Sequence, residues 1–268
     1  MKKRSVSLFL SVCLVILCLV QPAFAVETKS GEVDIDEIYA QVYEEAVSNR
    51  PEVITTDEDA YAYLISNIND IHKMGDGTIL IDQQAIKLSE QEKKIVSSFV
   101  KKLNTLIQLD AVTVDSKLKI HFVSNPEDTR ISTRRPIANI MAEARNHASE
   151  LKSVFDNALF TTKHFTAGMY FAERVKTGGV WDYKSYMGTN TLYYMEDLNK
   201  NMTGETIGNF HYGYVGRAVF EAGTLKSAAG MYQIISGTSD LGYWDSFFDD
   251  PADQKDIEWG IRMYENEH

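Results

Sequence analysis

The side chains best suited to acid–base chemistry lie in a glycine-rich stretch, GETIGNFHYGYVGRA, at residues 204–218. An imidazole titrates near neutral pH and can both accept and donate a proton, so we interpret His211 as the general base or acid of a phosphodiester transesterification. In the same scheme the amide of Asn209 donates to a developing oxyanion, and Tyr212 orients the scissile group. The alternatives are a histidine bonded to the backbone of a loop and an asparagine that is an ordinary turn residue.

The glycines of this stretch argue against a helix. Glycine is about 1 kcal/mol less favourable than alanine inside a helix, and the stretch lacks the alternation of apolar residues that is typical of a strand. We therefore expect an ordered loop over residues 208–216. Positive φ angles or a close approach of the backbone explain its glycines whether or not the loop is catalytic; they are Gly208, Gly213 and Gly216. We include Gly208 and Gly213 among the candidate substrate-binding residues.

A second polar stretch, GGVWDYKSYMG, occupies residues 178–188. Trp181 offers a ring on which a base can stack, Lys184 stabilises phosphate charge, and Asp182 adds a carboxylate. We expect this stretch and the glycine-rich stretch to line one cleft between the helices that carry them. The alternative is that Trp181 and Tyr183 pack in the core after the end of a helix, with Lys184 in solvent.

An acidic run near the C-terminus, Asp249-Asp250-Pro251-Ala252-Asp253, invites comparison with metal sites, where carboxylates gather. Its spacing favours a helix start, because Asp250 suits the N-cap, Pro251 the first helical position and Asp253 the first turn. We keep Asp250 and Asp253 as candidate substrate-binding residues. No set of His, Cys, Asp or Glu has the spacing of a zinc site, so we expect neither a metal nor a cofactor.

The part of the chain that must position these residues is mostly helical. Apolar residues recur at steps of three and four from Ile137 to Phe155, and further helices are expected at 166–177, 225–235 and 251–265. The preceding part mixes both kinds of element, with helices expected at 35–49, 57–72 and 89–106 and strands at 78–81 and 117–124. We expect a mainly α protein, α+β overall, in which a small α+β region of unknown role at 26–136 precedes a helical domain at 137–268, with the boundary in the proline-containing stretch 125–136.

The first 25 residues have the order of a secretory signal peptide. Three basic residues precede an apolar run, and the small-x-small sequence AFA at 23–25 predicts cleavage after Ala25. Both cysteines of the chain, Cys13 and Cys18, would leave with this peptide, so we expect a secreted, extracellular protein without disulfides. No other apolar stretch reaches the roughly 18 residues of a membrane span, so we expect no membrane contact after cleavage.

The chain is acidic, with a formal net charge of −11. Stable nucleic-acid-binding modules take much of their affinity from Lys and Arg, so the charge counts against such a module. It does not exclude an enzyme that holds a few phosphates in one cleft, because net charge does not describe a single site.

Four ordered blocks give the C-terminal part its resemblance to a known family. They are AGMYFAERVKTGGVWDYK (167–184), GNFHYGYVGRA (208–218), AAGMYQIISGTSD (228–240) and FDDPADQKDIEWGIRMY (248–264). These blocks resemble the polymorphic toxin type 44 domain, also called bacterial toxin 44, over about residues 137–268. The resemblance implies a mostly helical toxin domain with a G-N-x-x-x-G motif, Gly208-Asn209 to Gly213 here, and by analogy a ribonuclease. It also implies RNA as the substrate and an immunity or inhibitor protein as a partner.

Two other functions remain open on the sequence. The same C-terminal blocks loosely resemble the glycine-containing helix of lysozyme-like enzymes, and cleavage of peptidoglycan would need a catalytic acid such as Glu205 or Glu221. A non-catalytic, exported interaction protein would use the glycine-rich stretch only as architecture. Our expectation is a secreted toxin-like protein that acts as a metal-independent ribonuclease.

Overall fold

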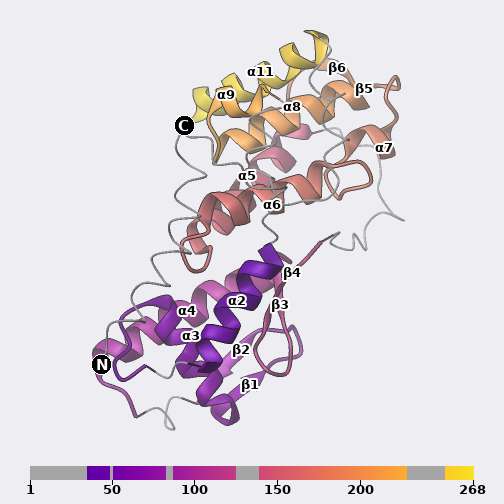
Figure 1. Ribbon diagram of the computed structural model, residues 1–268. Coiled ribbons are helices and arrows are strands. Elements are labelled where there is room, and N and C mark those ends of the chain that lie inside the picture. The colour runs from indigo at the N-terminus through magenta and orange to yellow at the C-terminus, as the bar shows by residue number, and fades with distance from the viewer. Residues whose placement is uncertain (1–34, 49–50, 83–86, 125–138, 228–250) are drawn as a thin grey trace, which may run out of the picture.

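The computed structural model describes residues 35–48, 51–82, 87–124, 139–227 and 251–268 (Figure 1). The expected signal peptide, the expected linker and Asp250 lie outside these residues, as does most of the helix expected at 225–235. Within the described ranges, no helix combines the length and the apolar character that a membrane crossing requires.

Residues 35–124, which we call the N-terminal unit, form a small α+β structure (indigo to magenta in Figure 1). Its elements are α2 (Ile35–Ser48), α3 (Asp57–Ser66), the short 3-10 helix η1 (Ile68–Asp70), β1 (Ile71–Lys73), β2 (Ile79–Ile81), α4 (Glu90–Gln108), β3 (Val112–Val114) and β4 (Ile120–Phe122). The strands form two antiparallel hairpins, β1 with β2 and β3 with β4. The helix expected at 57–72 ends earlier, because residues 71–73 pair with β2.

The remaining described residues form the C-terminal unit, which is mostly helical as expected. Its elements are α5 (Ile140–Asn157), α6 (Lys163–Val175), α7 (Tyr183–Met187), β5 (Leu192–Met195), β6 (Lys200–Thr203), α8 (Gly204–Arg217), α9 (Ala222–Leu225) and α11 (Pro251–Glu267). The amphipathic pattern from Ile137 to Phe155 is confirmed as α5, whose buried stripe includes Ala144, Ala148 and Leu151. The expected helix start at Pro251 is confirmed, with Asp253 in the first turn of α11.

The expected loop over residues 208–216 is wrong, because this stretch lies inside helix α8. Thr203 is the N-cap and its hydroxyl accepts a hydrogen bond from the backbone N–H of Thr206 at 3.1 Å. The glycines serve close packing: a Cβ on Gly213 would stand 2.1 Å from the carbonyl oxygen of Ile257, in α11. Packing of α8 on α11 therefore overrides the weak helix propensity of glycine.

The stretch at 178–188 is also more regular than expected, because it contains helix α7. Asp182 is the N-cap: its carboxylate accepts hydrogen bonds from the backbone N–H groups of Ser185 at 3.3 Å and Gly178 at 2.9 Å. The role expected for Asp182 in catalysis is thereby corrected to a structural one. The helix stop expected after α6 is confirmed, since Gly178 has φ +76°.

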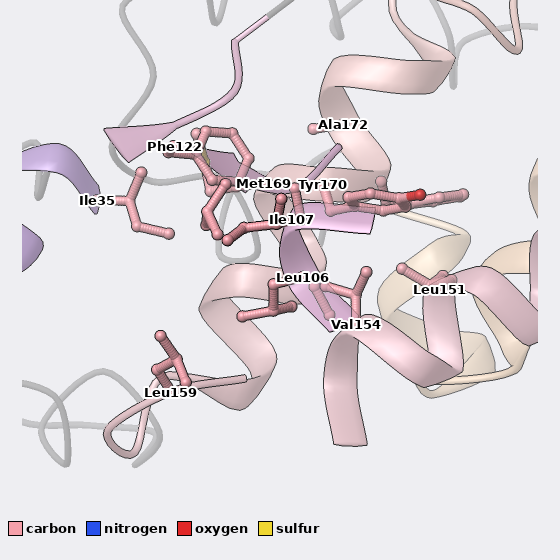
Figure 2. Packing of buried hydrophobic residues seen from close by; sticks show 14 of the residues in the cluster. Ile35, Leu106, Ile107, Phe122, Leu151, Val154, Leu159, Met169, Tyr170 and Ala172 are labelled. Atoms are coloured by element: carbon pink, nitrogen blue, oxygen red, sulfur yellow. The ribbon is translucent and has the colours of Figure 1, made fainter. Parts of the chain in front are cut away.

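One apolar core joins the two units. Phe160, between α5 and α6, inserts among three aromatic residues of the N-terminal unit, with ring centroids 6.1 Å from Tyr39, 5.7 Å from Tyr61 and 5.9 Å from Phe99. Helix α4 packs against α5, and Figure 2 shows Leu106 of α4 in the same cluster as Val154 of α5. The two units are therefore held by buried contacts and not only by the chain that connects them.

Candidate functional site

Two histidines from different helices meet in the C-terminal unit. Nε2 of His211, on α8, lies 2.8 Å from Nδ1 of His147, on α5. His211 is fully buried, whereas His147 is half-buried. Because a proton donor or acceptor must reach its substrate, His147 is the imidazole of this pair that can act on a bound molecule.

The hydrogen bonding of His211 restricts where the pair carries its protons. Nδ1 of His211 is buried without a hydrogen-bond partner. Because the two rings share one hydrogen bond between Nδ1 of His147 and Nε2 of His211, a protonated His147 must donate through Nδ1, and the neutral His211 ring then carries its proton on Nδ1. Burial, together with the neighbouring His147, holds the pKa of His211 well below its ordinary value. The pair therefore takes up a proton on His147, not on His211.

Trp181 fixes the orientation of the accessible ring. The rings of Trp181 and His147 are stacked, with centroids 4.4 Å apart and planes 20° apart. Trp181 is itself only 2 % exposed and also meets His211 edge-on at 5.6 Å. The alternative that Trp181 belongs to the core is thus confirmed, and a base cannot stack on its buried ring. Its position instead determines how His147 faces solvent.

A carboxylate accompanies His147 on α5. Glu143 precedes His147 by four residues, so the two side chains project from the same face of the helix with Cβ atoms about 6 Å apart. The hydroxyl of Tyr183 donates to Oε2 of Glu143 at 2.7 Å, and the Tyr183 ring lies 4.8 Å from that of His211. One oxygen of the half-buried Glu143 carboxylate is therefore held in place and the other can accept a proton.

Lys184 adds a positive charge beside the same face of α8. Its ammonium group lies 3.4 Å from Oε1 of Glu205, and its side chain passes over Gly208, where an added Cβ would meet Cγ of Lys184 at 3.5 Å. Gly208 and His211 are three residues apart on α8 and so share a face. The structure therefore brings Lys184 and His211 to one side of α8. We call Glu143, His147, Trp181, Tyr183, Lys184 and His211 the imidazole site.

Asn209 and Tyr212 do not join this site. Asn209 is fully buried on the α11 side of α8, where its Nδ2 donates to Oδ1 of Asp253 at 2.6 Å. Tyr212 is buried against Phe171, with ring centroids 5.2 Å apart, and its hydroxyl donates to the carbonyl of Leu225 at 3.2 Å. The expected oxyanion donor, orienting phenol and substrate-binding carboxylate Asp253 are therefore corrected to buried structural groups. Gly213 likewise faces α11 and not a substrate.

Sequence reasoning missed Glu143 and His147. Both lie within the strong amphipathic pattern of α5, which drew attention to its apolar residues alone. The available signal was a carboxylate and an imidazole four residues apart on the polar side of that helix. Within the described parts of the chain, His, Cys, Asp and Glu side chains do not gather into a group of three or more that could hold a metal ion.

Comparison with known proteins identifies one family. The model of the bacterial toxin 44 family matches residues 170–266, which confirms the expected resemblance over that stretch. The matched residues include Trp181, Lys184 and His211, whereas Glu143 and His147 precede them. No curated protein and no solved structure matches the chain.

Proposed function

We propose that this chain is a bacterial toxin-like protein that acts as a metal-independent ribonuclease, a proposal supported by the match of residues 170–266 to the model of the bacterial toxin 44 family. The observation that supports this activity best is a half-buried imidazole, His147, hydrogen-bonded to a buried one, His211, with the carboxylate of Glu143 one helical turn away. An acid and a base on one face are what an RNA transesterification needs.

In the proposed reaction Glu143 takes the proton of a ribose 2′-hydroxyl while the 2′-oxygen attacks the adjacent phosphorus. The bond to the 5′-oxygen breaks, and the protonated imidazole of His147 donates its Nε2 proton to that leaving oxygen. Nδ1–H of His147 donates at this stage to Nε2 of His211, whose own proton then resides on Nδ1. The products are a 2′,3′-cyclic phosphate and a free 5′-hydroxyl.

Lys184 supplies the charge that such a reaction requires. Negative charge grows on the phosphate as the 2′-oxygen attacks, and a nearby ammonium group stabilises it. Lys184 is paired with Glu205 at 3.4 Å, and both side chains are partly exposed, so this pair is weak and exchanges easily for a phosphate.

Export and an immunity partner complete the proposal. The basic, apolar and AFA order of residues 1–25 supports secretion after cleavage at Ala25. A producing cell that makes a ribonuclease needs protection until export, and the bacterial toxin 44 domain supports an immunity protein as the protecting partner.

The decisive experiment compares His147→Gln with His164→Gln, a change of an exposed histidine on α6 outside the imidazole site. Labelled RNA is incubated with each protein in EDTA, and cleavage is followed by gel. Loss of a positioned acid or base costs about 10²- to 10⁴-fold in rate, so His147→Gln and Glu143→Gln should lose that much. His164→Gln and the exposed-carboxylate control Glu196→Gln should cut like the unmodified protein.

Assays with other substrates test the proposed mechanism and the competing functions. DNA of the same sequence lacks the 2′-hydroxyl and should not be cut; equal cleavage of DNA in EDTA would contradict the proposed reaction. Purified peptidoglycan tests the lysozyme-like alternative, for which Glu205 and Glu221 are poorly placed, because Glu221 is exposed and Glu205 is ion-paired. Inactivity on RNA would overturn the proposal, and release of peptidoglycan fragments would replace it.

A further inference from the structure

A buried arginine connects the N-terminal unit to the imidazole site. Arg174, near the end of α6, is 4 % exposed. Its Nη2 donates to the carbonyl oxygens of Leu109 at 3.0 Å and Asp110 at 3.4 Å, both at the end of α4. A buried guanidinium needs partners for its charge and its donors. The N-terminal unit provides the carbonyls of Leu109 and Asp110, and α6 itself provides the carbonyl of Tyr170, to which Nη1 donates at 3.5 Å.

The end of α4 is shaped to receive this cation. Asp110 has φ +52°, and the backbone N–H of Ala111 returns to the carbonyl of Leu106 at 2.9 Å, which closes the helix in a left-handed turn. The last carbonyl groups of a helix carry the negative end of its dipole, so a cation is favoured there. Leu106, in the last turn of α4, is buried in the core shared by the two units, where α4 packs against α5 (Figure 2).

Arg174 in turn contacts the residue that orients His147. Its guanidinium carbon lies 3.3 Å from the ring centroid of Tyr170 and 5.8 Å from that of Trp181. The backbone N–H of Trp181 donates to the carbonyl oxygen of Arg174 at 2.7 Å. Because Trp181 stacks on His147 at 4.4 Å, an unbroken series of contacts runs from the end of α4 to the accessible imidazole.

We propose that the N-terminal unit is a working part of the toxin's active site: the end of α4 holds Arg174, and Arg174 positions His147 through Trp181. The inference deepens the proposed function and rests on it for the catalytic role of His147. Arg174 is a positioning residue, since it acts only through Trp181. Without the α4 carbonyls the guanidinium would lose acceptors that its buried position requires, and Trp181 would lose the group that supports its ring and backbone.

The test compares two substitutions at the same junction in the full chain. Arg174→Met removes the hydrogen bonds to α4 and keeps an apolar side chain of similar reach. Phe160→Leu loosens the packing of Phe160 against Tyr39, Tyr61 and Phe99 but leaves Arg174 unchanged. Both should lower the melting temperature, so stability alone does not distinguish them.

The distinguishing readout is the titration of the His147 ring, followed by NMR and assigned with His147→Gln. His211 on α8 is hydrogen-bonded to this ring, and Glu143 and Glu150 lie four and three residues away on α5. Tyr183 on α7 is hydrogen-bonded to Glu143, and Lys184 lies on the same side of α8 as His211. Arg174→Met should move the His147 titration midpoint by about half a pH unit or more, because the ring is displaced relative to these groups. The Phe160→Leu variant should titrate like the unmodified protein.

RNA cleavage provides the second readout. Misplacement of a reacting group by about 1 Å costs up to about 10²-fold, so Arg174→Met should lower kcat by about 10- to 100-fold with KM little changed. If Arg174→Met does not fold, Arg174→Lys replaces it in both measurements. Lys retains the charge but lacks the planar guanidinium that lies over the Tyr170 ring, so the same changes are expected at a smaller magnitude. An unchanged His147 titration in the folded Arg174 variant, or an equal change in Phe160→Leu, overturns the inference.

The two proposals fail in different ways. If the unmodified protein does not cut RNA, the proposed ribonuclease is wrong, while the His147 titration still reports whether Arg174 positions that ring. If RNA is cut and the Arg174 variants match the unmodified protein in both the His147 titration and RNA cleavage, the proposed ribonuclease is supported and the proposed role of the N-terminal unit is wrong.

Discussion

Helix α8 presents two faces with opposite designs. Toward α11 it offers backbone: Gly213 lies against the carbonyl of Ile257, and the carbonyl of Phe210 lies against Gly260. Toward α5 and α7 it offers the buried His211, which contacts His147 and Tyr183. The α11 face is built for close approach and the other for placing an imidazole. The glycine-rich stretch therefore has two separate roles in one helix: one face packs against α11, and the other places His211.

This difference changes what the G-N-x-x-x-G motif signifies. Gly213 faces α11, and so does Asn209, through its hydrogen bond to Asp253. Gly208 lies under Lys184 on the other face. Two of the three motif residues thus secure the junction of α8 with α11, and His211, between them in the sequence, is carried to the opposite side. Residues that are neighbours in a helical sequence do not share a site unless their spacing is three or four.

The largest effect is expected from a methyl group on the α11 face. In Gly213→Ala the new Cβ would meet the Ile257 carbonyl at 2.1 Å, and in Gly260→Ala it would meet the Phe210 carbonyl at 2.0 Å. Both obstacles are backbone, so the helices must separate. Overpacking of this kind costs about 1–3 kcal/mol and occasionally more, and we expect about 3 kcal/mol for each, measured by urea unfolding at pH 7.

Gly223→Ala in α9 is the matched control, because nothing lies within 4 Å of its added Cβ. It should change the free energy of unfolding by less than about 1 kcal/mol. If Gly213→Ala is as mild as Gly223→Ala, then α8 and α11 do not pack through their backbones and the contrast between the two faces is lost.

The amphipathic helices and the capping signals could be predicted from the sequence, whereas α8 could not. At Ser89 the expected capping box is present, with the Ser89 hydroxyl accepting from the Glu92 N–H at 3.3 Å. Such signals lie within a few residues of what they determine. The α8 helix accommodates Gly213 because this residue packs against the carbonyl of Ile257 in α11, a residue distant in sequence whose position is not known until α11 is docked.

Some residues of the candidate site could likewise be predicted from the sequence, and others could not. His211 and Lys184 could be selected from residue type, but the accessible partner His147 and the supporting Tyr183–Glu143 hydrogen bond depend on how α5, α7 and α8 meet. Burial also reversed the expected roles: the histidine in the conspicuous stretch is the inaccessible one. Tertiary packing, which decides burial, is the information that the local sequence lacks.

A smaller effect is expected from pH on the imidazole face. The pKa of His211 is held well below its ordinary value of 6.5 in the folded protein, whereas the imidazole of the unfolded chain takes up a proton near pH 6.5. The unfolded state thus binds more protons as the pH falls below 6.5, and stability decreases there by at most about 1.4 kcal/mol per pH unit. His211→Phe removes this contribution.

Urea unfolding of the unmodified protein and of His211→Phe at pH 7 and pH 5 measures this difference. The stability advantage of the unmodified protein over His211→Phe should shrink by about 1–2 kcal/mol at the lower pH. Gly213→Ala involves no proton, so its loss of stability should be the same at both values. A pH-independent advantage over His211→Phe would mean that His211 is accessible to protons in the folded state.

The smallest effect is expected from Gly208→Ala, and its sign is opposite to that of Gly213→Ala. The added Cβ would meet Cγ and Cε of Lys184 at 3.5 and 3.8 Å and Cβ of Tyr183 at 3.9 Å, all ordinary van der Waals contacts with side chains. Alanine favours a helix interior over glycine by about 0.5–1 kcal/mol, so the variant should be more stable by up to that amount, measured by urea unfolding. RNA cleavage by the same variant tests whether Gly208 also gives Lys184 room to move, because the added methyl group would contact the Lys184 side chain.

Higher stability with unchanged cleavage would mean that Gly208 has no role in the reaction. Higher stability with slower cleavage would mean that Lys184 must move to bind phosphate. A loss of stability comparable to that of Gly213→Ala would show that both faces of α8 are closed by backbone contacts.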